Sequence, residues 1–164
     1  MKKTIATYIS VPVLFVCLFC GCAEGTGDKG KTAKTAVIGI KELRVAVEVA
    51  DSLEQRSKGL SGRKRLGKNS GMLFIFPQEG NHAFWMKGCY LDLDLAFLDS
   101  AGSVLKVLTM KKQAPNVPDY VLRAYEPGTP RVKYALEMNE GWFGKNGIKA
   151  GEKLVLPELA VPAD

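Results

Sequence analysis

The run Phe84-Trp85-Met86-Lys87 combines a large aromatic ring with a cation at close spacing. In an extended chain Trp85 and Lys87 are two residues apart, so their side chains share one face. A flat indole ring beside an ammonium group is a common way to hold a sugar, an aromatic ring or an anionic small molecule. The alternative is a tryptophan that packs in the core beside a solvated lysine. The run therefore predicts either a ligand site or an ordinary core segment.

Two acidic residues, Asp92 and Asp94, form a second candidate. On a strand their carboxylates would project from the same face, roughly 7 Å apart. That spacing would suit Ca²⁺ or the paired acids of a glycosidase. The two residues also alternate with leucines as the polar side of a half-buried strand. An ion pair to Arg56 or Arg63 would then give them a purely structural role.

Several other chemistries lack the residues that they need. His82 is the only histidine, and a structural zinc site would require three more Cys or His ligands. A serine hydrolase of the Gly-x-Ser-x-Gly type is excluded because the chain has no such motif. Cys89 and His82 are seven residues apart, up to roughly 23 Å in extended backbone, which disfavours a thiol and base pair. We expect no metal and no cofactor, and no catalytic residue can be named.

The N-terminal residues resemble a bacterial export signal. Met1-Lys2-Lys3 is a positive segment, and residues 5–19 are almost uniformly apolar but too short to span a bilayer comfortably. The following Leu18-Phe19-Cys20-Gly21-Cys22 resembles a lipobox, in which the cysteine after a small residue is lipidated. The sequence predicts a signal peptide over 1–21, a lipidated Cys22, and a flexible polar tether over 22–37. Ordinary cleavage with release from the membrane is the alternative.

Length and charge limit the remaining function classes. A chain of 164 residues with 46% apolar and 24% charged residues fits one folded domain, here expected over 38–160. The net charge of +6 includes Lys2 and Lys3, and the one dense basic block is Arg63-Lys64-Arg65. Nucleic-acid binding usually needs a concentrated basic face, so we expect no nucleic-acid partner.

The pattern of the body predicts a mainly β domain. Alternation over 43–50 indicates a half-buried strand, and Asp51 with Glu54 forms a capping box for a short helix over 52–58. Turn residues at 99–103 join two strands into an antiparallel hairpin, and 111–131 is a long, proline-rich loop. Further strands are expected at 71–77, 83–87, 91–98, 104–108, 134–139 and 153–156. The fold class is therefore mainly β (α+β): a small, mostly antiparallel and nearly closed barrel with a short helix across one end.

Separated motifs occur along the body in this order: Arg56-Ser57-Lys58-Gly59-Leu60, Arg63, Gly71-Met72-Leu73-Phe74, Phe84-Trp85-Met86-Lys87, Leu91-Asp92-Leu93, Leu136-Glu137, Gly141, and Ile148-Lys149-Ala150-Gly151-Glu152. Together they resemble the domain of unknown function 192 family over about residues 40–157. The resemblance implies a small, mostly β domain found in exported or anchored proteins of bacteria and archaea. It implies no particular biochemical activity.

These observations favour a non-enzymatic ligand-binding or interaction module that is lipid-anchored in the cell envelope. Its partners would be the membrane, through the anchor, and a small molecule or an envelope protein. The alternative is an envelope hydrolase that uses a polar Arg/Asp/Glu cluster. A purely structural partner without a small-molecule site is the third hypothesis. The candidate ligand-binding residues are Arg56, Arg63, Trp85, Lys87, Asp92, Asp94 and Glu137.

Overall fold

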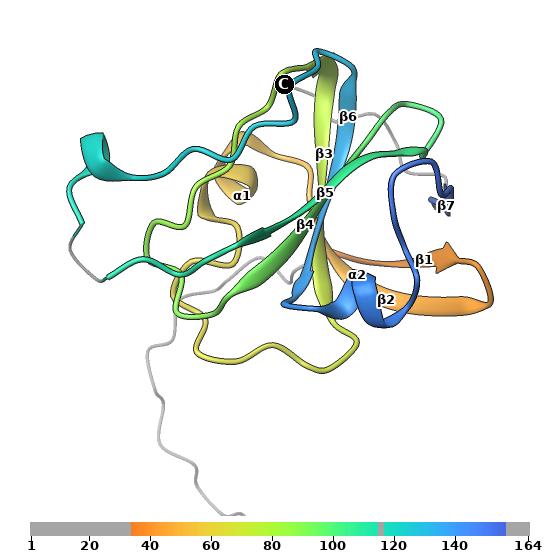
Figure 1. Ribbon diagram of the computed structural model, residues 1–164, viewed down its shortest axis with the longest axis horizontal. Coiled ribbons are helices and arrows are strands. Elements are labelled where there is room, and N and C mark those ends of the chain that lie inside the picture. The colour runs from red at the N-terminus through yellow and green to blue at the C-terminus, as the bar shows by residue number, and fades with distance from the viewer. Residues whose placement is uncertain (1–33, 115–116, 157–164) are drawn as a thin grey trace, which may run out of the picture. The chain divides into compact units, whose positions relative to one another are not determined.

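Seven strands form one sheet in the described part of the chain (Figure 1). The computed structural model describes residues 34–114 and 117–156, so the predicted signal peptide and Cys22 lie outside the described residues. The strands are β1 (Thr35–Ile40), β2 (Leu43–Ala50), β3 (Gly71–Gly80), β4 (Leu93–Leu98), β5 (Val104–Met110), β6 (Val132–Asn139) and β7 (Leu154–Val155). Strand β1 begins three residues before the body predicted from the sequence.

The sheet is mostly antiparallel and runs in the order β5-β4-β6-β3-β2-β1-β7. Strands β2 and β3 pair in parallel, and all other neighbours are antiparallel. The continuous apolar run at the start of β3 is buried on both faces and occupies the middle of this order, as its sequence predicted. The β4 and β5 hairpin is also confirmed.

The two ends of the sheet approach each other, so the sheet is curled. Ser103 and Lys153 form an antiparallel bridge, and the Leu154 backbone N–H donates to the Gly102 carbonyl at 2.9 Å. Gly102 has a φ of 78°, and a Cβ there would lie 2.6 Å from the Leu154 carbonyl oxygen. Only glycine fits this close approach without strain. The prediction of a small, mainly β, barrel-like domain is confirmed.

Both faces of the sheet are covered by apolar side chains. Strand β4 contributes Leu93, Leu95 and Phe97 to one hydrophobic cluster and Ala96 and Leu98 to the other. Figure 1 shows helix α1 (Leu53–Lys58) on one side of β3 and β6, and helix α2 (Trp142–Lys145) on the other. The expectation that β4 is half-buried is therefore wrong, because packing from α2 also covers the side that carries Asp94.

Helix α1 forms where the sequence places it, but its cap is displaced by one residue. Ser52 is the N-cap, its Oγ accepts from the Gln55 N–H at 3.3 Å, and Gln55 Oε1 accepts from the Ser52 N–H at 3.0 Å. The Asp51 carboxylate instead accepts a bond from Lys34 Nζ at 2.8 Å. The predicted Asp51 and Glu54 capping box is wrong, because a Ser-x-x-Gln pair one residue further on satisfies the same donors.

The strand expected at 83–87 does not form. Phe84 alone pairs there, as an isolated bridge to Tyr125 with backbone bonds of 3.0 and 2.8 Å. The partner segment is the 111–131 loop, whose prolines cannot donate to a ladder. The described parts of that predicted loop, 111–114 and 117–131, include one 3-10 turn, η1 (Asp119–Val121).

Candidate functional site

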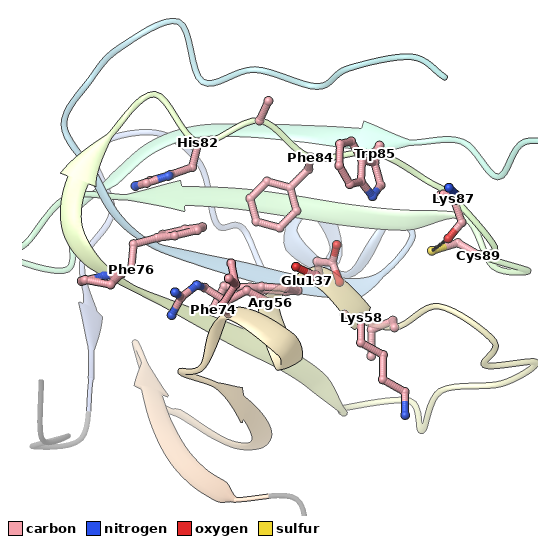
Figure 2. A pocket seen from close by; sticks show the side chains of 16 residues that line it. Arg56, Lys58, Phe74, Phe76, His82, Phe84, Trp85, Lys87, Cys89 and Glu137 are labelled. Atoms are coloured by element: carbon pink, nitrogen blue, oxygen red, sulfur yellow. Dashed lines mark hydrogen bonds between the residues drawn. The ribbon is translucent and has the colours of Figure 1, made fainter. Parts of the chain in front are cut away.

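A pocket of about 380 Å³ opens on the face of the sheet next to α1. Its walls come from α1 and the turn after it, from β3, from β6, and from the segment 82–89 that links β3 to β4. In Figure 2, Phe76 and His82 lie at one end of the pocket, Lys87 and Cys89 lie at the opposite end, and Glu137 lies between them. The pocket is therefore built from segments that are far apart in sequence.

Aromatic rings form much of the wall. Phe74 and Phe76 are two apart on β3 and so share one face, and Phe84 meets both of them edge to face, with ring centroids 5.0 and 6.3 Å away. The His82 ring stacks on Phe76, with the ring centroids 3.6 Å apart. Trp85 is 57% exposed and lies at the rim. The Phe84 bridge to the long loop holds this wall in place.

The buried acid of the pocket is Glu137. It is on β6, opposite Met72 of β3 and Leu95 of β4, and only 5% of its surface is exposed. Its Oε2 atom is buried and has no hydrogen-bond partner. Burial raises the pKa of the Glu137 carboxyl to about 8, because desolvation penalises the charged form. At neutral pH this side chain is therefore mostly protonated and can donate a hydrogen bond.

Three cationic side chains also line the pocket: Arg56, Lys58 and Lys87. Arg56 Nη1 donates to the backbone carbonyls of Asp51 at 2.7 Å and Ile75 at 3.0 Å, which fixes the guanidinium between α1 and β3. Lys87 pairs with Asp119 of η1 at 2.7 Å, and both side chains are largely exposed. The ion pair connects the pocket rim to the 111–131 loop.

The other predicted site residues lie elsewhere. Arg63 pairs with Glu48, and that carboxylate raises the pKa of the guanidinium. Asp92 accepts from the Lys112 N–H at 2.7 Å, which is the main cause of its lowered pKa, and also pairs with Lys111. The expected ion pairs from Asp92 and Asp94 to Arg56 or Arg63 do not form.

Asp94 has a structural setting that the sequence does not reveal. It is 4% exposed and accepts from Thr109 Oγ1 at 2.8 Å and from the Phe143 N–H at 3.4 Å. It thereby joins β4, β5 and α2. The polar Arg/Asp/Glu cluster is thus not assembled, and Arg56, Trp85, Lys87 and Glu137 are the predicted residues that the pocket brings together.

Cys89 and His82 both line the pocket although the sequence disfavoured a pair between them. Burial, with a contribution from Glu137, raises the pKa of the Cys89 thiol to about 11, so it stays protonated and weakly nucleophilic. Desolvation lowers the pKa of His82, whose Nε2 lies 3.2 Å from the Gln78 carbonyl oxygen. These settings suit lining groups better than an activated dyad.

Sequence reasoning missed Lys58, Phe74 and Phe76 as pocket residues. The alternation of Phe74 and Phe76 along β3 was the available signal, but a continuous apolar run does not show which face meets a cavity. Among the described residues no group of three His, Cys, Asp or Glu side chains could hold a metal ion. No helix in the same part of the chain is long and apolar enough to cross a membrane.

In the described part of the chain, a curled seven-stranded sheet with an acid buried in an aromatic pocket defines a small β domain. The chain belongs to the DUF192 family, described as "Uncharacterized ACR", which matches residues 36–156. The fold is similar to that of a candidate transcription regulator from Sinorhizobium meliloti 1021, with 26% identity and a TM-score of 0.65. That match covers 77% of this chain and 97% of the other.

A second similar structure is a protein of unknown function from Novosphingobium aromaticivorans DSM 12444. It has 24% identity and a TM-score of 0.61, and the match covers 80% of this chain and 99% of the other. No curated protein matches the chain significantly. Both solved chains consist almost entirely of the matched region.

Proposed function

We propose that the protein is an exported, lipid-anchored binding module of the cell envelope, and that the pocket beside α1 is its small-molecule site. The module acts without catalysis. The alternative of an envelope hydrolase has less support, because Arg63, Asp92 and Asp94 are engaged away from the pocket in other contacts.

The observation that carries the proposal is the unpartnered Glu137 carboxyl at the pocket. Burying a carboxyl group without a hydrogen bond lowers the stability of the folded protein. A side chain with a purely structural role would be expected to avoid that cost. A methionine or leucine at this position would pack against Met72 and Leu95 without that penalty. A bound molecule that pairs with Glu137 accounts for an acid at this position, and the aromatic walls supply apolar contact area.

The N-terminal residues support the location of this module. The positive Met1-Lys2-Lys3, the apolar residues 5–19 and the Gly21-Cys22 step match the order of a lipoprotein signal. The anchor would be the lipidated Cys22, followed by a polar tether. The proposed module would therefore face the envelope while attached to a membrane, where an envelope protein is its alternative partner.

Native mass spectrometry tests the binding function. Residues 32–164, which form one compact unit, would be fused to a cleavable export signal, produced in a bacterial host and purified without denaturation. We expect extra mass that disappears on denaturation and that is absent from the Glu137→Ala variant but present in Glu79→Gln, an exposed acid on the same sheet. A clean mass of the unliganded monomer would contradict a tightly held small molecule and direct the search towards a protein partner.

A further inference from the structure

We propose that the pocket takes an organic carboxylate with an aromatic body, whose anionic oxygen accepts a hydrogen bond from the Glu137 carboxyl while nearby cations balance its charge. The inference rests on the proposed function, because it names the class of ligand for the same site.

The charges that line the pocket favour an anion. Arg56, Lys58 and Lys87 are cationic, and Glu137 is the one acidic residue among the described lining residues. The charge of Lys87 is already balanced by Asp119, so the unpaired cations of the lining are Arg56 and Lys58. A ligand ammonium group would meet these two like charges and an acid that is largely protonated at neutral pH. A ligand carboxylate would instead meet two opposite charges. Coulomb attraction at short range in a partly desolvated pocket then selects against the cation.

The hydrogen-bonding capacity of Glu137 points the same way. The Glu137 carboxyl lines the pocket and its Oε2 atom has no hydrogen-bond partner, so a hydrogen bond from this carboxyl to a ligand would offset the cost of its burial. A protonated carboxyl that donates to a carboxylate oxygen forms a charge-assisted O–H···O⁻ bond, which is about twice as strong as a neutral one. A ligand carboxylate therefore satisfies the buried acid and the surrounding cations together.

The walls select the body of the ligand. Phe74, Phe84 and the half-exposed Trp85 present ring faces and edges to a space of about 380 Å³. This volume is near the lower end of the range for small-molecule pockets. A single aromatic ring on a short linker fits it and can make edge-to-face contacts with the wall.

Binding of such a ligand requires the protonated form of Glu137, so affinity should depend on pH. Strands β3 and β4 place the apolar Met72 and Leu95 opposite Glu137. The titratable groups around it come from α1 and from the segment 82–89: Arg56, Lys58, His82, Lys87 and Cys89. The pKa of Cys89 is about 11, so its thiol stays protonated up to pH 9, and the pKa of His82 is lowered, so its ring is already neutral at pH 7. Of these three groups, Glu137, with a pKa of about 8, is therefore the group that changes charge between pH 7 and pH 9.

Three probes with one body and different charges test the inference: 3-phenylpropionate, 3-phenylpropan-1-ol and 3-phenylpropylamine. Isothermal titration calorimetry of residues 32–164 would measure their affinities from pH 6 to pH 9. We expect the carboxylate to bind at least about tenfold more tightly than the alcohol and the amine to bind most weakly. The carboxylate affinity should fall about tenfold from pH 7 to pH 9, as Glu137 loses its proton.

Variants assign the effect to named groups. Glu137→Gln retains a neutral donor, so it should bind the carboxylate at pH 7 and lose the pH dependence. Lys58→Gln should weaken carboxylate binding several-fold. Lys64→Gln removes the same charge from an exposed residue that does not line the pocket, and it should leave the affinity unchanged.

The outcomes separate the ligand class from the binding function. Tighter binding of the amine or the alcohol, or a carboxylate affinity that is unchanged between pH 7 and pH 9, would overturn the ligand class and leave the pocket as a binding site. If none of the three probes binds and the molecule found by native mass spectrometry is not a carboxylate, the proposed ligand class is overturned but the binding function is not. Failure of all three with no native adduct would overturn both proposals.

Discussion

At the scale of single residues, the burial of Glu137 lowers the free energy of unfolding by an amount that can be measured without knowing the ligand. Its carboxyl has an ordinary pKa of 4.5, which burial raises to about 8. Between about pH 5 and pH 8 the unfolded chain has lost a proton that the folded protein keeps. The free energy of unfolding must therefore fall as pH rises through this range, and the loss is complete above pH 8.

The expected consequence is that Glu137→Gln gains stability relative to the wild type with rising pH. The difference should grow by about 1.4 kcal/mol per pH unit between pH 5 and pH 8, because the amide does not ionise. Urea denaturation at pH 5, 6, 7 and 8 would measure it. The control Glu79→Gln should follow the wild type at every pH. Parallel curves for Glu137→Gln and the wild type would show that the Glu137 pKa is not raised.

Asp92 and Asp94 show what the residue pattern could and could not predict about the candidate site. Both carry the same carboxylate at strand spacing, and the sequence could not tell which one faces solvent. Only the packing of α2 makes Asp94 a buried acceptor for Phe143, whereas Asp92 stays near the surface beside Lys111. Of the predicted candidates, Trp85 and Lys87 came from their spacing in one run, and Arg56 and Glu137 came from the polar cluster; all four line the pocket.

At the scale of elements, helix α1 carries Arg56 and Lys58 to the pocket and has no buried residue of its own. A helix of six residues is too short to be stable from propensity alone. The reciprocal bonds between Ser52 and Gln55 therefore contribute much of its local stability. The cap consequently also holds two of the three pocket cations in position.

We expect Ser52→Ala to reduce the free energy of unfolding by about 1 kcal/mol, the usual cost of losing an N-cap. Glu54→Ala removes the acid of the capping box that was predicted from the sequence. It should reduce the free energy of unfolding by no more than about 0.5 kcal/mol. Chemical denaturation of both variants at pH 7 makes the comparison. An equal or larger loss for Glu54→Ala would support the Asp51 and Glu54 cap instead.

Local sequence patterns predicted most helices and strands, because the pattern of apolar and polar residues in each of them depends mainly on which of its own faces are buried. The alternation of β2 and the continuous apolar run of β3 depend only on which faces are buried. The segment 83–87 has the same local pattern, but a strand also needs a continuous partner, and Tyr125 provides a single bridge. Partners are set by long-range contacts, which one sequence does not show.

At the scale of the whole molecule, the same limit applies to the sheet order. The hairpin of β4 and β5 follows from its short turn, but the insertion of β6 between β4 and β3 joins segments far apart in the chain. The parallel pairing of β2 with β3 was likewise not predicted. This order places Glu137 between β3 and β4 and beneath the segment 82–89, so the pocket follows from the topology.

The proposed attachment to a membrane is also a property of the whole chain. If Cys22 is lipidated, its acyl chains add about 0.8 kcal/mol of membrane affinity per buried CH₂ group, which is enough for stable anchoring with two or more chains. The domain itself then needs no membrane-binding surface. Expression of the full chain in a bacterial host tests this, because acylation and cleavage change both the mass and the detergent partitioning.

We expect the wild-type chain to partition into the detergent phase of Triton X-114 and to incorporate labelled fatty acid. The Cys22→Ser variant should incorporate no label and retain the mass of residues 1–21. Cys20→Ser changes the neighbouring cysteine by the same chemistry and should behave as the wild type, since Gly21-Cys22 remains intact. Labelling that disappears in Cys20→Ser but persists in Cys22→Ser would move the lipid to Cys20. A wild-type chain that is cleaved, unlabelled and recovered in the aqueous phase would instead show release after ordinary cleavage, and the binding domain would then work as a free envelope protein.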